Sequence, residues 1–152
     1  YKVVASKVKI SKQGKNKDGT FFISSPSDST SVKYYGYKFD KQGKLTNVDV
    51  GYQPRAVEKV FELLGKKFGN YKEAYRVKSA TKFSKADMYG YFWKLPQGGV
   101  FLEYGNFFEG LHYCRIYYCD NKVYAKKRKE FLDKADGTAF KLYRLDDNDV
   151  KL

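Results

Sequence analysis

The chain has 152 residues, of which 42% are hydrophobic and 31% charged, a composition typical of a folded globular protein rather than a disordered one. This length suits one domain, so we interpret residues 1–152 as a single domain, and no apolar run approaches the roughly 20 residues of a membrane-spanning helix. The formal net charge of +13 indicates attraction to polyanions or acidic proteins, although such a charge equally serves solubility.

The first third of the chain predicts strands and polar loops. Residues 3–10 form a strand candidate, residues 11–20 have the composition of an exposed basic loop, and residues 21–23 form a short return strand. Residues 32–39 and 44–52 alternate apolar and polar side chains on either side of a four-residue turn that ends in Gly. This pattern predicts a β-hairpin.

Residues 54–64 carry the clearest helical pattern of the chain. Apolar side chains recur at positions i, i+3, i+4 and i+7 and end at Leu64. Pro54 suits the first helical turn, and Gly65 suits the position after the last one. We therefore expect this helix to bury Phe61 and Leu64 against a sheet.

The stretch 89–119 contains the only Trp and the only His of the chain and is rich in aromatic and β-branched residues. Such residues favour strands, and Gly-containing turns interrupt them. We predict three consecutive antiparallel strands, at residues 89–95, 100–104 and 111–119.

Three further elements complete the predicted fold. Residues 74–77 form a short strand candidate, residues 125–135 read as a short basic helix after a turn at 121–122, and residues 139–145 form a last strand candidate. The predicted fold class is α+β: a single antiparallel sheet with one main amphipathic helix on one face and a second short helix near the C-terminus.

The residues that commonly carry catalysis or bind metals are scarce. His112, Cys114 and Cys119 are the only imidazole and thiol groups, and a metal site needs several such ligands or carboxylates. On a regular strand the two cysteines point to opposite faces about 16 Å apart, beyond the reach of a disulfide. We expect two buried free thiols, no cofactor, no metal site and no enzymatic activity.

The strand at 111–119 offers a candidate site for a binding partner. Cys114 and Ile116 form its more apolar side, which we assign to the core. Tyr113, Arg115 and Tyr117 then point outward, and Tyr and Arg are enriched at binding hot spots. The alternative is that a terminal strand or loop covers this face.

A second candidate site binds polyanions through the cluster Lys126, Lys127, Arg128 and Lys129 of the second helix. Tyr and Phe on a sheet, with Lys and Arg around them, are also how proteins hold single-stranded nucleic acid. No motif of a known nucleic-acid-binding class accompanies them. Nucleic-acid binding is therefore the alternative and not the favoured function.

The order of elements in residues 55–119 carries a resemblance to a known group. The helix ends in the sequence ELLGK at 62–66, and the apolar stretches YFWKLP at 91–96 and VFLEY at 100–104 follow it. This segment resembles the modules of β-lactamase-inhibitor-protein-like proteins and related small bacterial outer-membrane lipoproteins. The resemblance implies an exported, non-enzymatic protein that binds another protein through a concave sheet face.

The expected function is that of a small, basic, exported binding protein for another protein or a polyanion. The alternative is an intracellular nucleic-acid-binding protein. The pattern predicts no oligomeric state.

Overall fold

A computed structural model describes residues 12–26, 31–79, 86–106, 112–135 and 139–145. The strands are β1 (Lys12–Asn16), β2 (Gly19–Ser24), β3 (Val32–Phe39), β4 (Leu45–Tyr52), β5 (Glu73–Ser79), β6 (Asp87–Leu95), β7 (Gly98–Asn106), β8 (His112–Asp120) and β9 (Phe140–Arg144). The helices are η1 (Pro54–Ala56), α2 (Val57–Phe68) and α3 (Asn121–Asp133). Within the described ranges, no helix combines the length and apolar character that crossing a bilayer requires.

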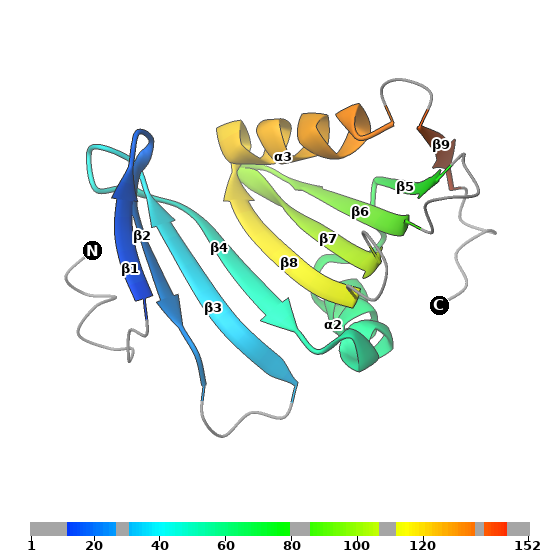
Figure 1. Ribbon diagram of the computed structural model, residues 1–152, viewed down its shortest axis with the longest axis horizontal. Helices are drawn as coiled ribbons and strands as arrows, with labels where there is room; N and C mark the ends of the chain where they lie inside the picture. Colours follow the sequence, from blue (N-terminus) through cyan, green and yellow to red (C-terminus); the bar gives the residue numbers. More distant parts are fainter. Residues whose placement is uncertain (1–11, 27–30, 80–85, 107–111, 136–138, 146–152) are drawn as a thin grey trace.

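The nine strands form one sheet in the order β1-β2-β3-β4-β8-β7-β6-β5-β9, and every neighbouring pair is antiparallel. Helix α3 lies along one side of the sheet and α2 lies on the other (Figure 1). The predicted fold class, α+β with a single antiparallel sheet and two helices, is confirmed.

The N-terminal strands form two successive hairpins. The hairpin predicted for residues 32–52 is confirmed as β3 and β4. The exposed loop predicted for residues 11–20 is wrong, because β1 pairs with β2 there. β1 is an edge strand, and lysines that protect such an edge from aggregation also give it the composition of a loop. The strand candidate at residues 3–10 lies outside the described residues.

The three consecutive strands predicted for residues 89–119 are confirmed as β6, β7 and β8. Strand β8 then joins the two halves of the sheet by pairing with β4, with Asn47 opposite Cys119 and Tyr52 opposite Cys114. The short strands predicted near residues 74–77 and 139–145 are also present, as β5 and β9, and they pair with each other.

Helix α2 packs on the sheet as its apolar stripe predicts. Leu64 is 2% exposed, and the half-buried Phe61 ring contacts three aromatic rings at centroid distances of 4.9, 6.0 and 6.2 Å. The helix passes through Gly65, where we predicted its end, and stops at Gly69, whose φ of 77° is left-handed. The extra turn brings Phe68 to 6.4 Å from the Tyr118 ring, so a packing contact extends the helix.

The second predicted helix is confirmed as α3, but it starts earlier than predicted. The turn predicted at residues 121–122 is its first turn, because the Asp120 side chain accepts a hydrogen bond from the Val123 amide at 2.8 Å and caps the helix. Tyr124 and Phe131 fix α3 to the sheet, where both are buried. A Cβ built on Gly99 would lie 2.1 Å from the Tyr124 ring, so only glycine permits this close approach.

The two cysteines lie on opposite faces of β8. Cys114 packs in the hydrophobic cluster under α2, and Cys119 packs in the cluster under α3. Both thiols are free, as predicted. Burial raises the pKa of each thiol to about 12, so both stay protonated and unreactive at neutral pH.

Candidate functional site

Tyr113, Arg115 and Tyr117 share the face of β8 that α3 covers, so the structure brings together the residues predicted to bind a partner. They line a hollow of ≈ 250 Å³ between α3 and the strands β7 and β8, which we call the α3 pocket. Charged side chains of the neighbouring elements complete its wall: Glu103, Lys127, Glu130 and Lys134.

Tyr117 departs furthest from the predicted exposed patch, in which Tyr113 is half-buried and Arg115 is exposed. Tyr117 is 6% exposed, because α3 covers it, so the prediction that it points into solvent is wrong. Its ring stacks on Phe101 with centroids 5.4 Å apart, and the Lys127 ammonium lies 4.5 Å from its centroid on the helix side. Burial raises the pKa of the Tyr117 hydroxyl, which therefore remains a neutral hydrogen-bonding group.

A buried carboxylate forms part of the pocket. Glu103 is 6% exposed, its Oε1 accepts a hydrogen bond from Lys134 Nζ at 2.6 Å, and the Tyr113 hydroxyl donates to the same oxygen at 3.2 Å. Burial, followed by the nearby Glu103 charge, raises the pKa of the Tyr113 hydroxyl. Glu103 is thus paired with Lys134, the C-cap residue of α3, which makes this carboxylate a structural contact between the sheet and the end of the helix.

Arg115 lies at the mouth of the pocket and is exposed. Its guanidinium lies 5.4 Å from the Tyr113 ring centroid and is within hydrogen-bonding reach of the Tyr117 hydroxyl. Among the residues that the structure describes, no carboxylate forms an ion pair with Arg115. Two tyrosines therefore lie against a guanidinium that forms no ion pair with a described carboxylate, although the buried Glu103, opposite Arg115 on β7, still acts on its charge from within the pocket.

Two other arginines, on β5 and α3, differ from Arg115 in that each is paired with a carboxylate. Arg76 donates to both carboxylate oxygens of Asp87 at 2.8 and 2.7 Å. Arg128 donates to both carboxylate oxygens of Glu73, each at 2.8 Å. Both side chains use their planar fork to bind a carboxylate within the fold, whereas the Arg115 fork binds no described carboxylate.

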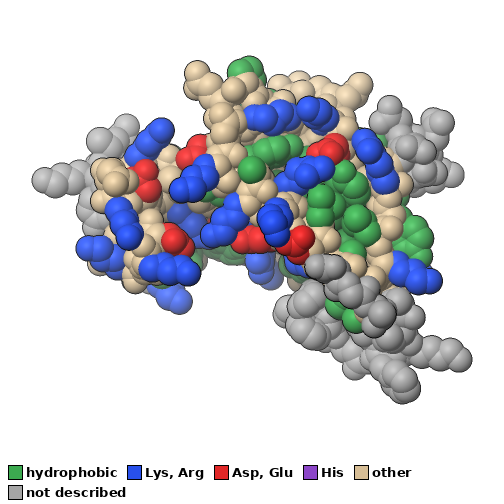
Figure 2. Space-filling model, turned by 90° about the horizontal axis from the view of Figure 1, so that it is seen from above, with side chains coloured by type: hydrophobic (Ala, Val, Ile, Leu, Met, Phe, Trp, Pro, Cys, Tyr) green, Lys and Arg blue, Asp and Glu red, His purple; other side chains and the backbone are tan. Residues whose placement is uncertain are grey.

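A groove continues from the pocket along α3 toward the turns of the N-terminal hairpins. This α3 groove has a volume of ≈ 380 Å³ and shares Lys127 and Glu130 with the α3 pocket. Its charged lining carries both signs: Lys38, Lys122, Lys126 and Lys127 with Asp18, Asp40, Asp120 and Glu130. Seen from this side, Lys and Arg side chains outnumber Asp and Glu over the described surface (Figure 2).

The basic cluster predicted to bind polyanions does not act as one surface. Arg128 is paired with Glu73, and Lys129 forms an i,i+4 ion pair with Asp133. Of the four residues of this cluster, only Lys126 and Lys127 line the α3 groove. Consecutive residues of a helix point in different directions, which separates the four side chains.

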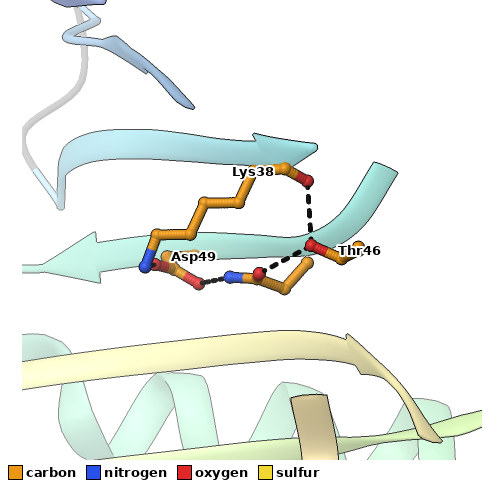
Figure 3. A network of polar contacts seen from close by, with 4 residues as sticks. Lys38, Thr46 and Asp49 are labelled. Atoms are coloured by element: carbon orange, nitrogen blue, oxygen red, sulfur yellow. Dashed lines mark hydrogen bonds and ion pairs between the residues drawn. The ribbon is translucent and has the colours of Figure 1, made fainter. Parts of the chain in front are cut away.

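Sequence reasoning missed a polar network on β3 and β4 that borders the α3 groove (Figure 3). Buried Asn47 donates from Nδ2 to Asp49 Oδ1 at 2.6 Å, and Lys38 Nζ lies 3.4 Å from Asp49 Oδ2. Thr46 Oγ1 donates to the Lys38 carbonyl at 3.2 Å. The signal was available in the sequence, because Asn47 and Asp49 take alternate positions of a strand whose other face is Val48 and Val50.

Within the described ranges, no group of three or more His, Cys, Asp and Glu residues is placed to hold a metal ion. His112 is exposed at the start of β8. No family model matches the chain, and no curated protein or solved structure matches it either.

Proposed function

We propose that this protein is a non-enzymatic binding protein that holds a carboxylate-bearing segment of another protein along the α3 groove. One acidic side chain of that segment occupies the mouth of the α3 pocket and pairs with Arg115. The observation that carries the proposal is the exposed guanidinium of Arg115, which lies against Tyr113 and forms no ion pair with a described carboxylate, because the nearby Glu103 is bonded to Lys134.

The physical support lies in preorganisation. An Arg fork forms two parallel hydrogen bonds with a carboxylate, and less entropy is lost when the side chain is already oriented. Tyr113 lies against one side of the guanidinium and the Tyr117 hydroxyl lies near it. Each hydrogen bond to a charged group contributes about 1.5–3 kcal/mol, which corresponds to roughly a tenfold to hundredfold change in affinity.

The electrostatics of α3 favour the same function. Lys122 lies in the first turn of α3, at the positive end of the helix dipole together with the carboxylate of the N-cap Asp120, and Lys126 lies one turn further along the helix. A cation in the first turn, such as Lys122, lowers helix stability by about 0.3–1 kcal/mol instead of raising it. Neither lysine forms an ion pair with another described residue. Two lysines that line the groove and form no ion pair within the described fold favour an acidic partner.

An acidic protein segment fits this groove better than nucleic acid does. A nucleic-acid backbone is uniformly anionic, but the groove also contains Asp18, Asp40, Asp120 and Glu130. Stacking of bases needs open rings, and Tyr117 is buried while Tyr113 is half-buried. In a peptide whose acidic residues are separated by neutral ones, the acidic side chains can pair with the lysines of the groove while neutral residues lie beside its carboxylates.

Export is part of the proposal, and its support is the resemblance of residues 55–119 to exported protein-binding modules. Fractionation of cells that produce the full gene product would test it. Recovery of all the protein in the cytosolic fraction would contradict it.

The binding proposal can be tested by fluorescence anisotropy with a labelled peptide in which Glu alternates with Ser. We expect Arg115→Gln to weaken binding at least about tenfold and Arg115→Lys to weaken it less, because Lys keeps the charge but not the fork. Arg55→Gln on η1 makes the same change in charge away from the groove and serves as control. Unchanged binding by Arg115→Gln, or tighter binding of a single-stranded oligonucleotide of equal charge, would contradict the proposal.

A further inference from the structure

The face of the sheet opposite α3 carries a second surface, which the proposed function does not use. Four half-buried tyrosines from three strands gather there beyond the edge of α2, and we call them the tyrosine face: Tyr35, Tyr37, Tyr52 and Tyr118. Tyr37 pairs with Val48, which pairs with Tyr118, so these three side chains form a row across β3, β4 and β8 on one face of the sheet. Burial, followed by the neighbouring Tyr118 and Tyr35, raises the pKa of Tyr52, and burial, followed by Tyr35, raises the pKa of Tyr118, as expected for hydroxyls that lie near one another.

Two hollows meet at Tyr118. One has a volume of ≈ 640 Å³ and lies between the start of β4 and the β6–β7 turn, with Leu45, Val48 and Leu95 in its lining. The other has a volume of ≈ 430 Å³ and lies against α2, with Tyr52 and Leu63 in its lining. Together they form an apolar trough, which we call the Tyr118 trough.

Two exposed leucines border this trough from opposite sides. Leu45 is 41% exposed on β4 and Leu63 is 55% exposed on α2. Exposed large side chains that join a contiguous apolar surface commonly mark a binding site, whereas isolated ones do not. A row of two hollows suits several side chains of one segment better than a single compact ligand.

The charged side chains around the trough indicate what kind of partner fits it. Lys66 and Lys67 line the α2 side, where Lys66 also forms an exposed i,i+4 ion pair with Glu62, and Lys44 directly precedes Leu45. A second copy of this chain is disfavoured, because each copy carries a net charge of +13 and the two would repel each other. An apolar segment flanked by acidic residues complements both the trough and its lysines.

We propose that the Tyr118 trough docks the apolar face of an amphipathic, acidic helix of a partner protein. Apolar side chains at positions i, i+3, i+4 and i+7 of that helix enter the two hollows on either side of Tyr118, and its acidic flanks meet Lys66 and Lys67. This surface is independent of Arg115, which lies on the opposite face of the sheet.

A designed peptide tests the proposal on the whole chain. The probe is a labelled peptide of about 18 residues with Leu at the helical anchor positions and Glu elsewhere, and the control is a scrambled peptide of equal composition. We expect the ordered peptide to bind at least about tenfold more tightly, and Leu45→Glu and Leu63→Glu each to remove that preference. Leu142→Glu is the matched control, because Leu142 is 41% exposed on the distant strand β9. Arg115→Gln is expected to leave this preference for the ordered peptide unchanged, even if it weakens the binding of both acidic peptides at the α3 groove.

Four results would overturn the proposal. The first is equal binding of the ordered and scrambled peptides, and the second is a loss of the preference in Leu142→Glu as large as in Leu45→Glu and Leu63→Glu. The third is a wild-type dimer in sedimentation that Leu63→Glu dissociates. The fourth is Leu63-dependent binding to phosphatidylglycerol vesicles without binding of the peptide. The third would assign the trough to a second copy of the chain, and the fourth to a membrane surface. Thermal melting of each variant confirms that the changes leave the fold intact.

Discussion

Leu63 and Leu64 are neighbours on α2 with opposite environments, so they form a matched pair for measuring how firmly this helix is docked. Leu64 is 2% exposed, whereas Leu63 is 55% exposed. Leu64→Ala removes three buried carbon atoms, which accounts for about 2.4 kcal/mol at roughly 0.8 kcal/mol each. The cavity left under the helix adds to this, for a total loss of about 3–4 kcal/mol. Leu63→Ala should change the free energy of unfolding by about 0.5 kcal/mol or less.

Urea denaturation monitored by the fluorescence of Trp93 measures both values. Trp93 is buried in the cluster that α2 covers, and its indole donates to the Gly69 carbonyl just after the helix. The expected result is a lower midpoint for Leu64→Ala with an unchanged slope. A loss below about 1 kcal/mol for Leu64→Ala, or equal losses for both variants, would refute the packing described for α2.

Three further predictions follow from other contacts. Cys114 and Cys119 should appear as two unbridged thiols in the mass spectrum of the non-reduced protein, and they should react with a disulfide reagent at pH 8 only after denaturant is added, because burial raises each thiol pKa to about 12. The Arg128 guanidinium lowers the pKa of Glu73 in the folded protein. The pair therefore stabilises the fold above the unfolded Glu pKa of about 4.3, and this stabilisation is lost as pH falls through the lower folded pKa. In denaturant titrations, Glu73→Gln should be less stable than wild type at pH 7, and the difference should shrink below about pH 4. Gly99→Ala should cost about 1–3 kcal/mol, because its Cβ would strike a buried ring of α3, and a neutral result in thermal melts would contradict the close approach of helix and sheet.

Local patterns in the sequence were enough to predict most elements. The hairpin of β3 and β4 and the stripe of α2 follow from periodicities that a few residues specify. The end of α2 did not follow, because a contact between Phe68 and the distant Tyr118 carries the helix past Gly65. Tertiary packing thus decided a boundary that propensity alone had placed earlier.

The candidate site was predictable in its grouping but not in its burial. Alternation along β8 places Tyr113, Arg115 and Tyr117 on one face, as the structure has them. Whether that face is open depends on α3, whose two buried residues, Tyr124 and Phe131, lie seven positions apart in a basic sequence. Such a narrow apolar stripe gives too little signal to predict which face of a sheet it covers.

The pairing of β4 with β8 also constrains how the chain acquires its structure during synthesis. The hairpins of β1–β4 pair residues that are close in sequence. The sheet becomes continuous only when β8 has been synthesised and pairs with β4, for example Cys119 with Asn47. Until then, the side of β4 that later pairs with β8 is an unpaired sheet edge, and such edges promote association between nascent chains. Because closing long loops slows folding, we expect docking of β8 on β4 to be a late and rate-limiting step.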